Sequence, residues 1–298
     1  MTIQRIISHN KLSLKLIAFT APALIFIFAF IFIPFFMTIF YSFTNWDGIR
    51  EAEFVGFDNY RRFVDDHNAI NSLTFTLRYA AVYVVSINVL SLLLASLINS
   101  KIAGKDFYRT AFYLPNVISL VIIGFIWQFI FRNVFDSLYL MSDESLAFLQ
   151  WSWLGDKDLA FYSVILVTLW QSIGFFTIVY YAALQSVPGD LLEAASIDGA
   201  GSIRRFFRIT VPMIMPTITF CVFFAIANSF KQFDLIFSLT DGGPGGATTT
   251  MALDIFRTGF GTLRQLGYGN AKSVILFVLV AVITALQISL FRRKEVEL

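Results

Sequence analysis

Five uncharged polar side chains within or beside apolar runs are the residues best suited to bind a solute. They are Asn116, Gln171, Ser172, Ser229 and Gln232. Amide and hydroxyl groups hydrogen-bond to solutes rich in hydroxyl groups, and the nearby rings of Trp170, Phe175 and Phe233 suit an apolar face of such a molecule. In the alternative interpretation these polar groups only join neighbouring helices, at about 0.6 kcal/mol per pair.

Residues for enzymatic chemistry are scarce. Cys221 is the sole cysteine and His9 and His67 are the only histidines, so the sequence excludes an intrachain disulfide and argues against a zinc site. The glycine-rich stretch 241–246 lacks the Gly-Lys-Ser/Thr ending of a phosphate-binding loop. We therefore expect no enzyme activity and no cofactor in this chain; if its work uses ATP, another subunit binds the nucleotide.

The composition requires that lipid surrounds much of the chain. Hydrophobic residues make up 57% and charged residues only 14%, whereas a water-facing surface needs about a quarter of its residues charged. A net charge of +2 is too small to indicate a nucleic-acid partner.

Long runs without charged residues predict helical spans, because lipid offers the backbone no hydrogen bonds and about 20 residues cross the bilayer. The fold class is therefore an all-α polytopic membrane protein with six transmembrane helices. The expected spans are at about residues 16–43, 77–100, 110–131, 159–187, 209–230 and 273–291. Residues 1–15 form a short amphipathic segment before the first span, which is too long for a cleaved secretory signal.

Basic residues predict the orientation, since they accumulate on the cytoplasmic side. With the N-terminus inside, the inner segments carry 12 basic and 6 acidic residues, and the outer ones 10 basic and 14 acidic. Both termini are therefore expected in the cytoplasm.

The inner segment 188–212 is predicted to form a helix–turn–helix. Pro188 suits the start of a helix, residues 199–201 (Gly-Ala-Gly) break it, and Pro212 marks the bend into the next span. Small side chains at the tip, flanked by three arginines, suit a docking element. They suit equally an ordinary basic loop in which alanine and glycine reflect helix propensity and a helix cap.

At these residues the sequence resembles a known family. Glu193-Ala194-Ala195, Gly199, Ile209 and Val211-Pro212 resemble the EAA motif of permease subunits of binding-protein-dependent ABC importers, although the family usually has Leu-Pro at the end. The segment 230–244 is similar to the one that follows the fifth span in sugar permeases of the maltose-importer type. Residues 55–60 and Leu114-Pro115 also fit this resemblance, so it covers essentially the whole chain.

The resemblance implies the type I ABC importer permease fold, residues 16–298 forming the transmembrane domain, and a bacterial inner membrane as the location. It implies a heterodimer with a second permease, an extracytoplasmic solute-binding protein, and two ATPase subunits that bind ATP and magnesium. The loop 188–212 would dock on an ATPase subunit, and the five polar residues named first match positions that line the solute cavity. The implied coupling residues are Glu193, Ala194, Ala195, Asp198, Gly199 and Ala200.

Three alternatives to a sugar importer stay open at this point. The solute could be a glycerol phosphate or another polyol, and Lys231 at the membrane edge could meet an anion unless it is solvated or paired with Asp234. An ion-coupled secondary transporter normally needs a buried Asp, Glu or His, and the six charge-free runs contain none. An intramembrane enzyme needs a nucleophile with a base or a metal, and Cys221 stands without a histidine in any of these runs.

Overall fold

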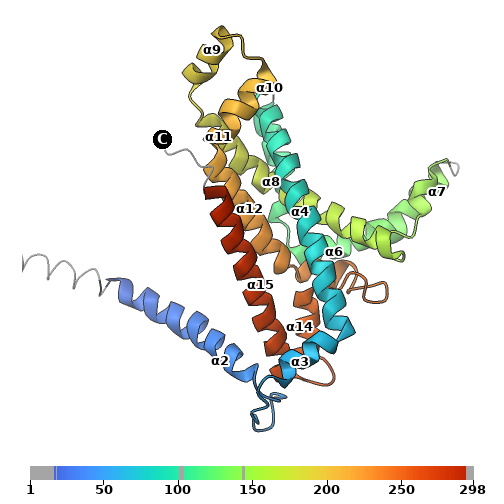
Figure 1. Cartoon of the computed structure of the whole chain (residues 1–298). Helices are drawn as coiled ribbons and strands as arrows, with labels where there is room; N and C mark the ends of the chain where they lie inside the picture. The colour runs from blue at the N-terminus through green and yellow to red at the C-terminus, as the bar shows by residue number, and fades with distance from the viewer. Residues whose placement is uncertain (1–16, 18, 101–103, 143–144, 293–298) are drawn as a thin grey trace, which may run out of the picture. The chain divides into compact units, whose positions relative to one another are not determined.

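The computed structural model describes residues 17, 19–100, 104–142 and 145–292. These residues are mostly helical, and their one isolated extended pairing joins Thr44 and Phe54. With η for a π-helical or 3₁₀ turn, the elements of Figure 1 are η1 (Phe28–Phe32), α2 (Ile33–Tyr41), α3 (Asp58–Asp65), α4 (His67–Asn99), α5 (Lys105–Val117), α6 (Leu120–Phe129), η2 (Ile130–Val134), α7 (Phe135–Met141), η3 (Ala147–Gln150), α8 (Lys157–Gln185), α9 (Gly189–Ile197), α10 (Ser202–Arg205), η4 (Phe206–Thr210), α11 (Val211–Met213), α12 (Met215–Phe230), α13 (Asp234–Leu239), α14 (Met251–Phe260) and α15 (Leu266–Arg292).

Within the described residues, five helices are long and apolar enough to cross a membrane, and a bent pair, Ser202–Met213 with Met215–Phe230, makes up to six. This agrees with the predicted all-α membrane protein. The chain divides into two compact units, Met1–Arg62 with Thr258–Val274, and Phe63–Arg257 with Ile275–Leu298.

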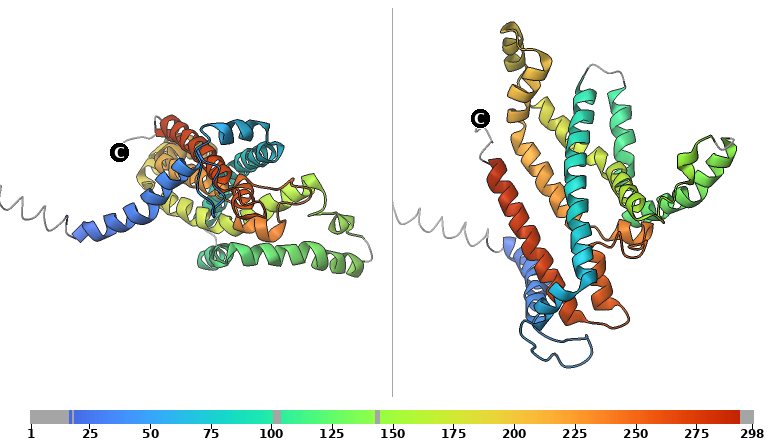
Figure 2. Two further views of the ribbon diagram at one scale, coloured as in Figure 1. Left: turned by 90° about the horizontal axis from the view of Figure 1, so that it is seen from below. Right: turned by 45° about the vertical axis from the view of Figure 1, so that its right-hand side comes forward.

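In the larger unit, α8 packs against α4 and α5, and α12 packs against α4. Residues spaced four apart form the buried seam between α4 and α8, because this spacing places them on one helix face. Tyr79, Tyr83 and Ile87 on α4 are almost fully buried, as are Phe176 and Tyr180 on α8. Figure 2 shows α7 projecting away from these helices in both views.

Aspartate caps begin the two longest helices. The Asp66 carboxylate accepts hydrogen bonds from the backbone N–H groups of Asn68 and Ala69, at 2.9 and 3.2 Å, before α4. Asp156 does the same before α8. Each carboxylate satisfies two of the backbone donors that a helix start leaves free. The helix α4 therefore starts ten residues before the expected span, which began at 77 beside charged Arg78; the Arg78 guanidinium lies 4.3 Å from the centre of the Phe161 ring.

The third expected span, 110–131, is not one continuous helix. The helix α5 ends at Val117, residues Ile118 and Ser119 are extended, and the next apolar helix runs from Leu120 to Met141. Pro115 near the end of α5 lacks a backbone N–H and crowds the preceding turn, which favours a break directly after it. The two parts pack against different helices: α5 packs against α8, and α6 packs against α13.

The fifth expected span, 209–230, also differs from the structure. Its helix begins at Ser202 and bends by 72° where α11 meets α12. Ile214 at the bend is buried, and Pro212 and Pro216 on either side each remove a backbone hydrogen bond. The sixth span is longer than expected, because α15 begins at Leu266.

The smaller unit contains the apolar helix Phe19–Tyr41 and the loop that follows it. No residue in the most apolar window of that helix is buried, so its surface is available to lipid or to a neighbouring subunit. The Asn59 amide closes the loop by donating to the carbonyls of Ser42 and Thr44, at 2.9 and 2.8 Å. Hydrogen bonds from the backbone N–H groups of Arg50 and Ile49 hold the pKa of the Asp47 carboxyl below its usual value.

Candidate functional site

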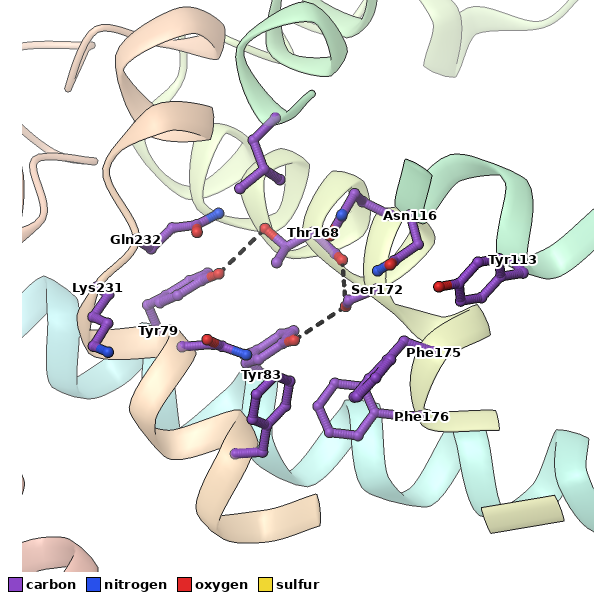
Figure 3. Close-up of a pocket in the computed structure, with 14 residues that line it drawn as sticks. Tyr79, Tyr83, Tyr113, Asn116, Thr168, Ser172, Phe175, Phe176, Lys231 and Gln232 are labelled. Atoms are coloured by element: carbon purple, nitrogen blue, oxygen red, sulfur yellow. Dashed lines mark hydrogen bonds between the residues drawn. The ribbon is translucent and has the colours of Figure 1, made fainter. Parts of the chain in front are cut away.

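The larger unit encloses a cavity of about 420 Å³, within the size range of small-molecule sites. It lies between α4, α5, α8 and the end of α12 (Figure 3). Its lining combines amides, hydroxyls and aromatic rings. The lining residues are Tyr79, Tyr83, Tyr113, Asn116, Leu120, Thr168, Gln171, Ser172, Phe175, Phe176, Phe224, Asn228, Lys231 and Gln232.

Four amide side chains in this lining have hydrogen-bonding capacity to spare. They are Asn116, Gln171, Asn228 and Gln232, and none of them has a side-chain hydrogen bond to another described residue. The Gln232 side chain is the most buried of the four, with 8% of the residue exposed, and its Nε2 has no partner. A buried amide without a partner is costly, and a solute hydroxyl or carbonyl would satisfy it.

The hydroxyl groups of the lining, by contrast, bond mainly to each other. The Tyr83 hydroxyl donates to Ser172 Oγ at 3.1 Å, and the Tyr79 hydroxyl donates to Thr168 Oγ1 at 3.2 Å. Ser172 Oγ also donates to the Thr168 carbonyl at 2.7 Å. These bonds form the wall between α4 and α8 that Figure 3 shows as dashed lines. The wall therefore holds the helices together and leaves solute contacts to the amides and rings.

Lys231 is the one charged residue in the lining. Its side chain is exposed, and among the described residues no carboxylate forms a salt bridge with it, Asp234 included. Lys231 and Gln232 lie on one side of the cavity, across from Asn116 and Tyr113 on α5 (Figure 3). The cavity thus offers a mostly neutral surface with a single positive charge.

The structure brings four of the five expected solute-path residues together at this cavity: Asn116, Gln171, Ser172 and Gln232. Ser229 is buried outside the lining, and its hydroxyl donates to the Ile226 carbonyl at 2.7 Å. Of the three rings expected nearby, only Phe175 belongs to the lining.

Sequence reasoning missed the tyrosines and the fourth amide of the lining. The four-residue spacing of Tyr79 with Tyr83, and of Thr168 with Ser172, was a signal for two facing polar stripes. Asn228 stands four residues before Gln232, and the same spacing could have indicated it. The break after α5, which brings Asn116 and Leu120 to the cavity, carried only the weaker signal of Pro115.

A second candidate site is the helix–turn–helix α9–α10, which forms one end of the larger unit in Figure 1. Gly199 has φ of +80° and ends α9 with two backbone hydrogen bonds. The Gly199 N–H donates to the Ser196 carbonyl at 3.1 Å, and the Ala200 N–H donates to the Ala195 carbonyl at 2.9 Å. This pair of bonds defines a Schellman cap, for which glycine is preferred because it adopts positive φ without strain. Arg205 then links the two helices by donating to the Leu192 carbonyl at 3.2 Å.

The six expected coupling residues lie on this element. Glu193, Ala194, Asp198 and Gly199 are exposed, and Ala195 and Ala200 are half-buried. Large apolar side chains around them also face outward: Ile197 is 87% exposed and Ile203 76%. Among the described residues, no atom lies within 4 Å of a Cβ built at Gly199, so they leave this surface open. Exposed apolar side chains beside a rigid, open tip are typical of a surface that another protein covers.

Apolar helices around a cavity of free amides, with an exposed helix–turn–helix at one end, define a membrane transport permease. The chain belongs to the family described as binding-protein-dependent transport system inner membrane component, whose model matches residues 71–296.

Relatives of known name agree with this family over most of the chain. A probable starch degradation products transport system permease protein, AmyD of Thermoanaerobacterium thermosulfurigenes, is 41% identical and covers 94% of both chains. A multiple sugar-binding transport system permease protein, MsmF of Streptococcus mutans, is 35% identical over 90% of this chain and 91% of its own. The sn-glycerol-3-phosphate transport system permease protein UgpA of Agrobacterium fabrum is 33% identical over 95% of this chain and 96% of its own.

The fold matches a solved structure as well. A chain of a bacterial ABC transporter involved in the import of the acidic polysaccharide alginate superposes with a TM-score of 0.81, at 24% identity, over 97% of this chain and 99% of that one. The chain therefore has the type I ABC importer permease fold that its sequence predicted.

Proposed function

We propose that this permease carries a neutral sugar or short oligosaccharide through the membrane as one subunit of an ATP-driven importer. The observation that supports the substrate class is the group of four unpartnered amides beside aromatic rings in one cavity. Amides bind hydroxyl groups in either hydrogen-bonding direction, and the rings of Phe175 and Phe224 offer the apolar contact that a sugar ring needs. The names of the AmyD and MsmF relatives point the same way.

In this proposal the chain works with partners. A second permease completes the path, an extracytoplasmic binding protein delivers the solute, and two ATPase subunits hydrolyse ATP. One ATPase subunit covers the exposed tip of α9–α10, so that tip faces the cytoplasm together with both chain termini, in a bacterial inner membrane. The open surface around Gly199 and the exposed Ile197 and Ile203 support this contact.

A glycerol phosphate is a second candidate solute, favoured by the position of Lys231. No carboxylate of a described residue pairs with this ammonium group at the cavity edge, and such a group suits a phosphate. The UgpA relative is named for such a solute.

Uptake by the reconstituted complex tests the proposal. The complex is purified with its partner subunits, placed in vesicles loaded with ATP, and supplied with its binding protein and radiolabelled maltotriose or sn-glycerol 3-phosphate. If the solute is a neutral sugar, Gln171→Leu lowers maltotriose uptake about fivefold through the loss of neutral hydrogen bonds, and Lys231→Gln leaves it unchanged. If it is a glycerol phosphate, Lys231→Gln lowers uptake of that compound more than tenfold, since bonds to charged groups are stronger. Wild-type vesicles that take up neither compound contradict the proposal.

A further inference from the structure

The segment that joins α12 to α13 carries Gln232 but belongs to neither helix. The helix α12 ends at Phe230 and α13 begins at Asp234. The Gln232 N–H reaches the Ser229 carbonyl only at 3.5 Å, at the limit of a hydrogen bond. Local helical hydrogen bonding therefore does little to fix the backbone at Gln232.

A threonine far along the chain supplies the missing constraint. The Thr250 hydroxyl donates to the Gln232 carbonyl at 2.8 Å and accepts from the Leu253 N–H at 3.3 Å. Thr250 is fully buried. A hydroxyl that is buried and bonded on both sides holds its partner in place, because moving either group leaves a buried polar atom unsatisfied.

The loop before Thr250 is itself tightly held by hydroxyl groups. Thr248 Oγ1 donates to the Gly243 carbonyl at 2.6 Å, and Thr249 Oγ1 donates to the Gly242 carbonyl at 3.3 Å. Gly242 has φ of +73°, and a Cβ there would lie 2.5 Å from Thr249 Oγ1, so the close approach requires glycine. The loop 240–250 is therefore a fixed support for Thr250.

A second bond ties the residue after Thr250 to α4, another wall of the cavity. The Met251 N–H donates to Thr76 Oγ1 at 2.8 Å, and Thr76 Oγ1 donates to the Ser72 carbonyl at 2.7 Å. Thr76 is fully buried on α4, one turn before Tyr79, which lines the cavity. Thr250 and its neighbour Met251 thus hold the backbone at Gln232 and the part of α4 that carries Thr76.

We infer that Thr250 is a positioning residue for solute binding: its hydroxyl fixes the backbone at Gln232 so that the unpartnered amide faces the cavity. Thr250 does not line the cavity and contacts solute only through Gln232. The inference rests on the proposed function, since it assigns the Gln232 amide to the solute.

Cysteine labelling tests the positioning without any transport. Cys221 is the sole cysteine, so Cys221→Ser with Gln232→Cys gives the complex one reactive thiol in this chain, whose backbone carbonyl can still accept from Thr250. Adding Thr250→Val, which has the same shape but no hydroxyl, is expected to change the rate of labelling by a methanethiosulfonate reagent about fivefold. Adding Thr250→Ser, which keeps the hydroxyl, leaves the rate unchanged. Equal rates in the Val and Thr backgrounds overturn the inference.

Uptake measured per ATP hydrolysed tests the consequence for solute. The assay uses the vesicles described above and whichever probe the wild type transports, maltotriose or sn-glycerol 3-phosphate. Thr250→Val lowers the amount of solute moved per ATP about fivefold, and Thr250→Ser keeps the wild-type amount. In the Gln232→Leu background Thr250→Val has no further effect, because the side-chain amide that Thr250 positions through the backbone carbonyl is already absent.

A matched control separates positioning from general damage. Thr177 is also buried, with 2% of the residue exposed; its hydroxyl bonds to no described residue, and it does not line the cavity. Thr177→Val is expected to leave labelling and transport unchanged. Two results overturn the inference, provided that the wild type transports one of the probes. One is additive loss of transport in the Gln232→Leu, Thr250→Val double variant, and the other is a parallel fall of uptake and ATP hydrolysis in Thr250→Val. A wild type that transports neither probe overturns the proposed function instead. The labelling experiment still tests the positioning in that case, because it does not require transport.

Discussion

Replacement of Gly174 by alanine should force α5 away from α8 and deform the cavity. A Cβ at Gly174 would overlap the Phe112 carbonyl and lie 2.6 Å from the Cα of Tyr113. Carbon atoms pack at about 3.5–4.0 Å, so α5 has to withdraw by about 1 Å. These obstacles are backbone atoms, and no side-chain rotation can relieve the contact. Tyr113 and Asn116 move with α5, while Gln171 stays on α8.

Overpacking of this kind costs about 1–3 kcal/mol, which corresponds to a fall in Tm of about 3–10 °C for a chain of this size. The measurement is thermal unfolding of the purified complex in detergent, followed by tryptophan fluorescence, together with solute uptake in vesicles. We expect both the lower Tm and reduced uptake.

Gly189→Ala is the matched control. A Cβ at Gly189 meets nothing within 4 Å and the residue has no positive φ, so alanine is expected to be neutral or slightly stabilising. If Gly174→Ala unfolds within 1 °C of the wild type, a margin about a third of the smallest expected shift, and transports normally, then α5 and α8 do not touch at this point and the reasoning is refuted.

Two further predictions concern the helix–turn–helix α9–α10 and the wall between α4 and α8. The substitutions Gly199→Asp and Gly199→Asn are compatible with the positive φ of the helix cap, but their side chains fill the open space beside it. Assembly should therefore be normal, while transport and ATPase stimulation by the binding protein are lost. Wild-type uptake by Gly199→Asn would mean that glycine serves only as a cap. Tyr180→Phe removes the bond from the Tyr180 hydroxyl to Asn88 Oδ1, at 2.5 Å, and should lower Tm by about 2–4 °C, for a loss of about 1 kcal/mol. Uptake should stay normal because neither residue lines the cavity, and a selective loss of uptake at unchanged Tm would contradict this role.

The sequence predicted the all-α membrane fold because lipid imposes a simple requirement on the backbone. It did less well where a charge or a break occurs inside a helix. The charge of Arg78 limited the start of the expected second span, whereas α4 begins ten residues earlier and the Arg78 guanidinium lies against Phe161. Pro115 sits in an apolar run that reads as one span, and only tertiary contacts show that α5 and α6 serve different neighbours.

The candidate site was predictable in kind and only partly in detail. Rare amides in apolar runs are easily seen, and three of the four free amides were identified in this way. Ser229 looked equivalent in sequence, but its hydroxyl bonds to its own helix, which a one-dimensional pattern cannot distinguish from a cavity contact. The support from Thr250 to Gln232 joins residues 18 apart through an irregular loop and has no periodic signal at all.

The 72° bend between α11 and α12 affects how force applied at the tip of the molecule travels. Because the short helix Ser202–Met213 meets α12 at a steep angle, a push along the short helix acts mostly across α12 and only weakly along it. The far end of α12 carries Asn228 at the cavity, so such a push swings this amide sideways instead of sliding it lengthwise. If an ATPase subunit pushes on the helix–turn–helix, as the proposed function requires, the bend converts that push into a tilt of α12 beside the cavity.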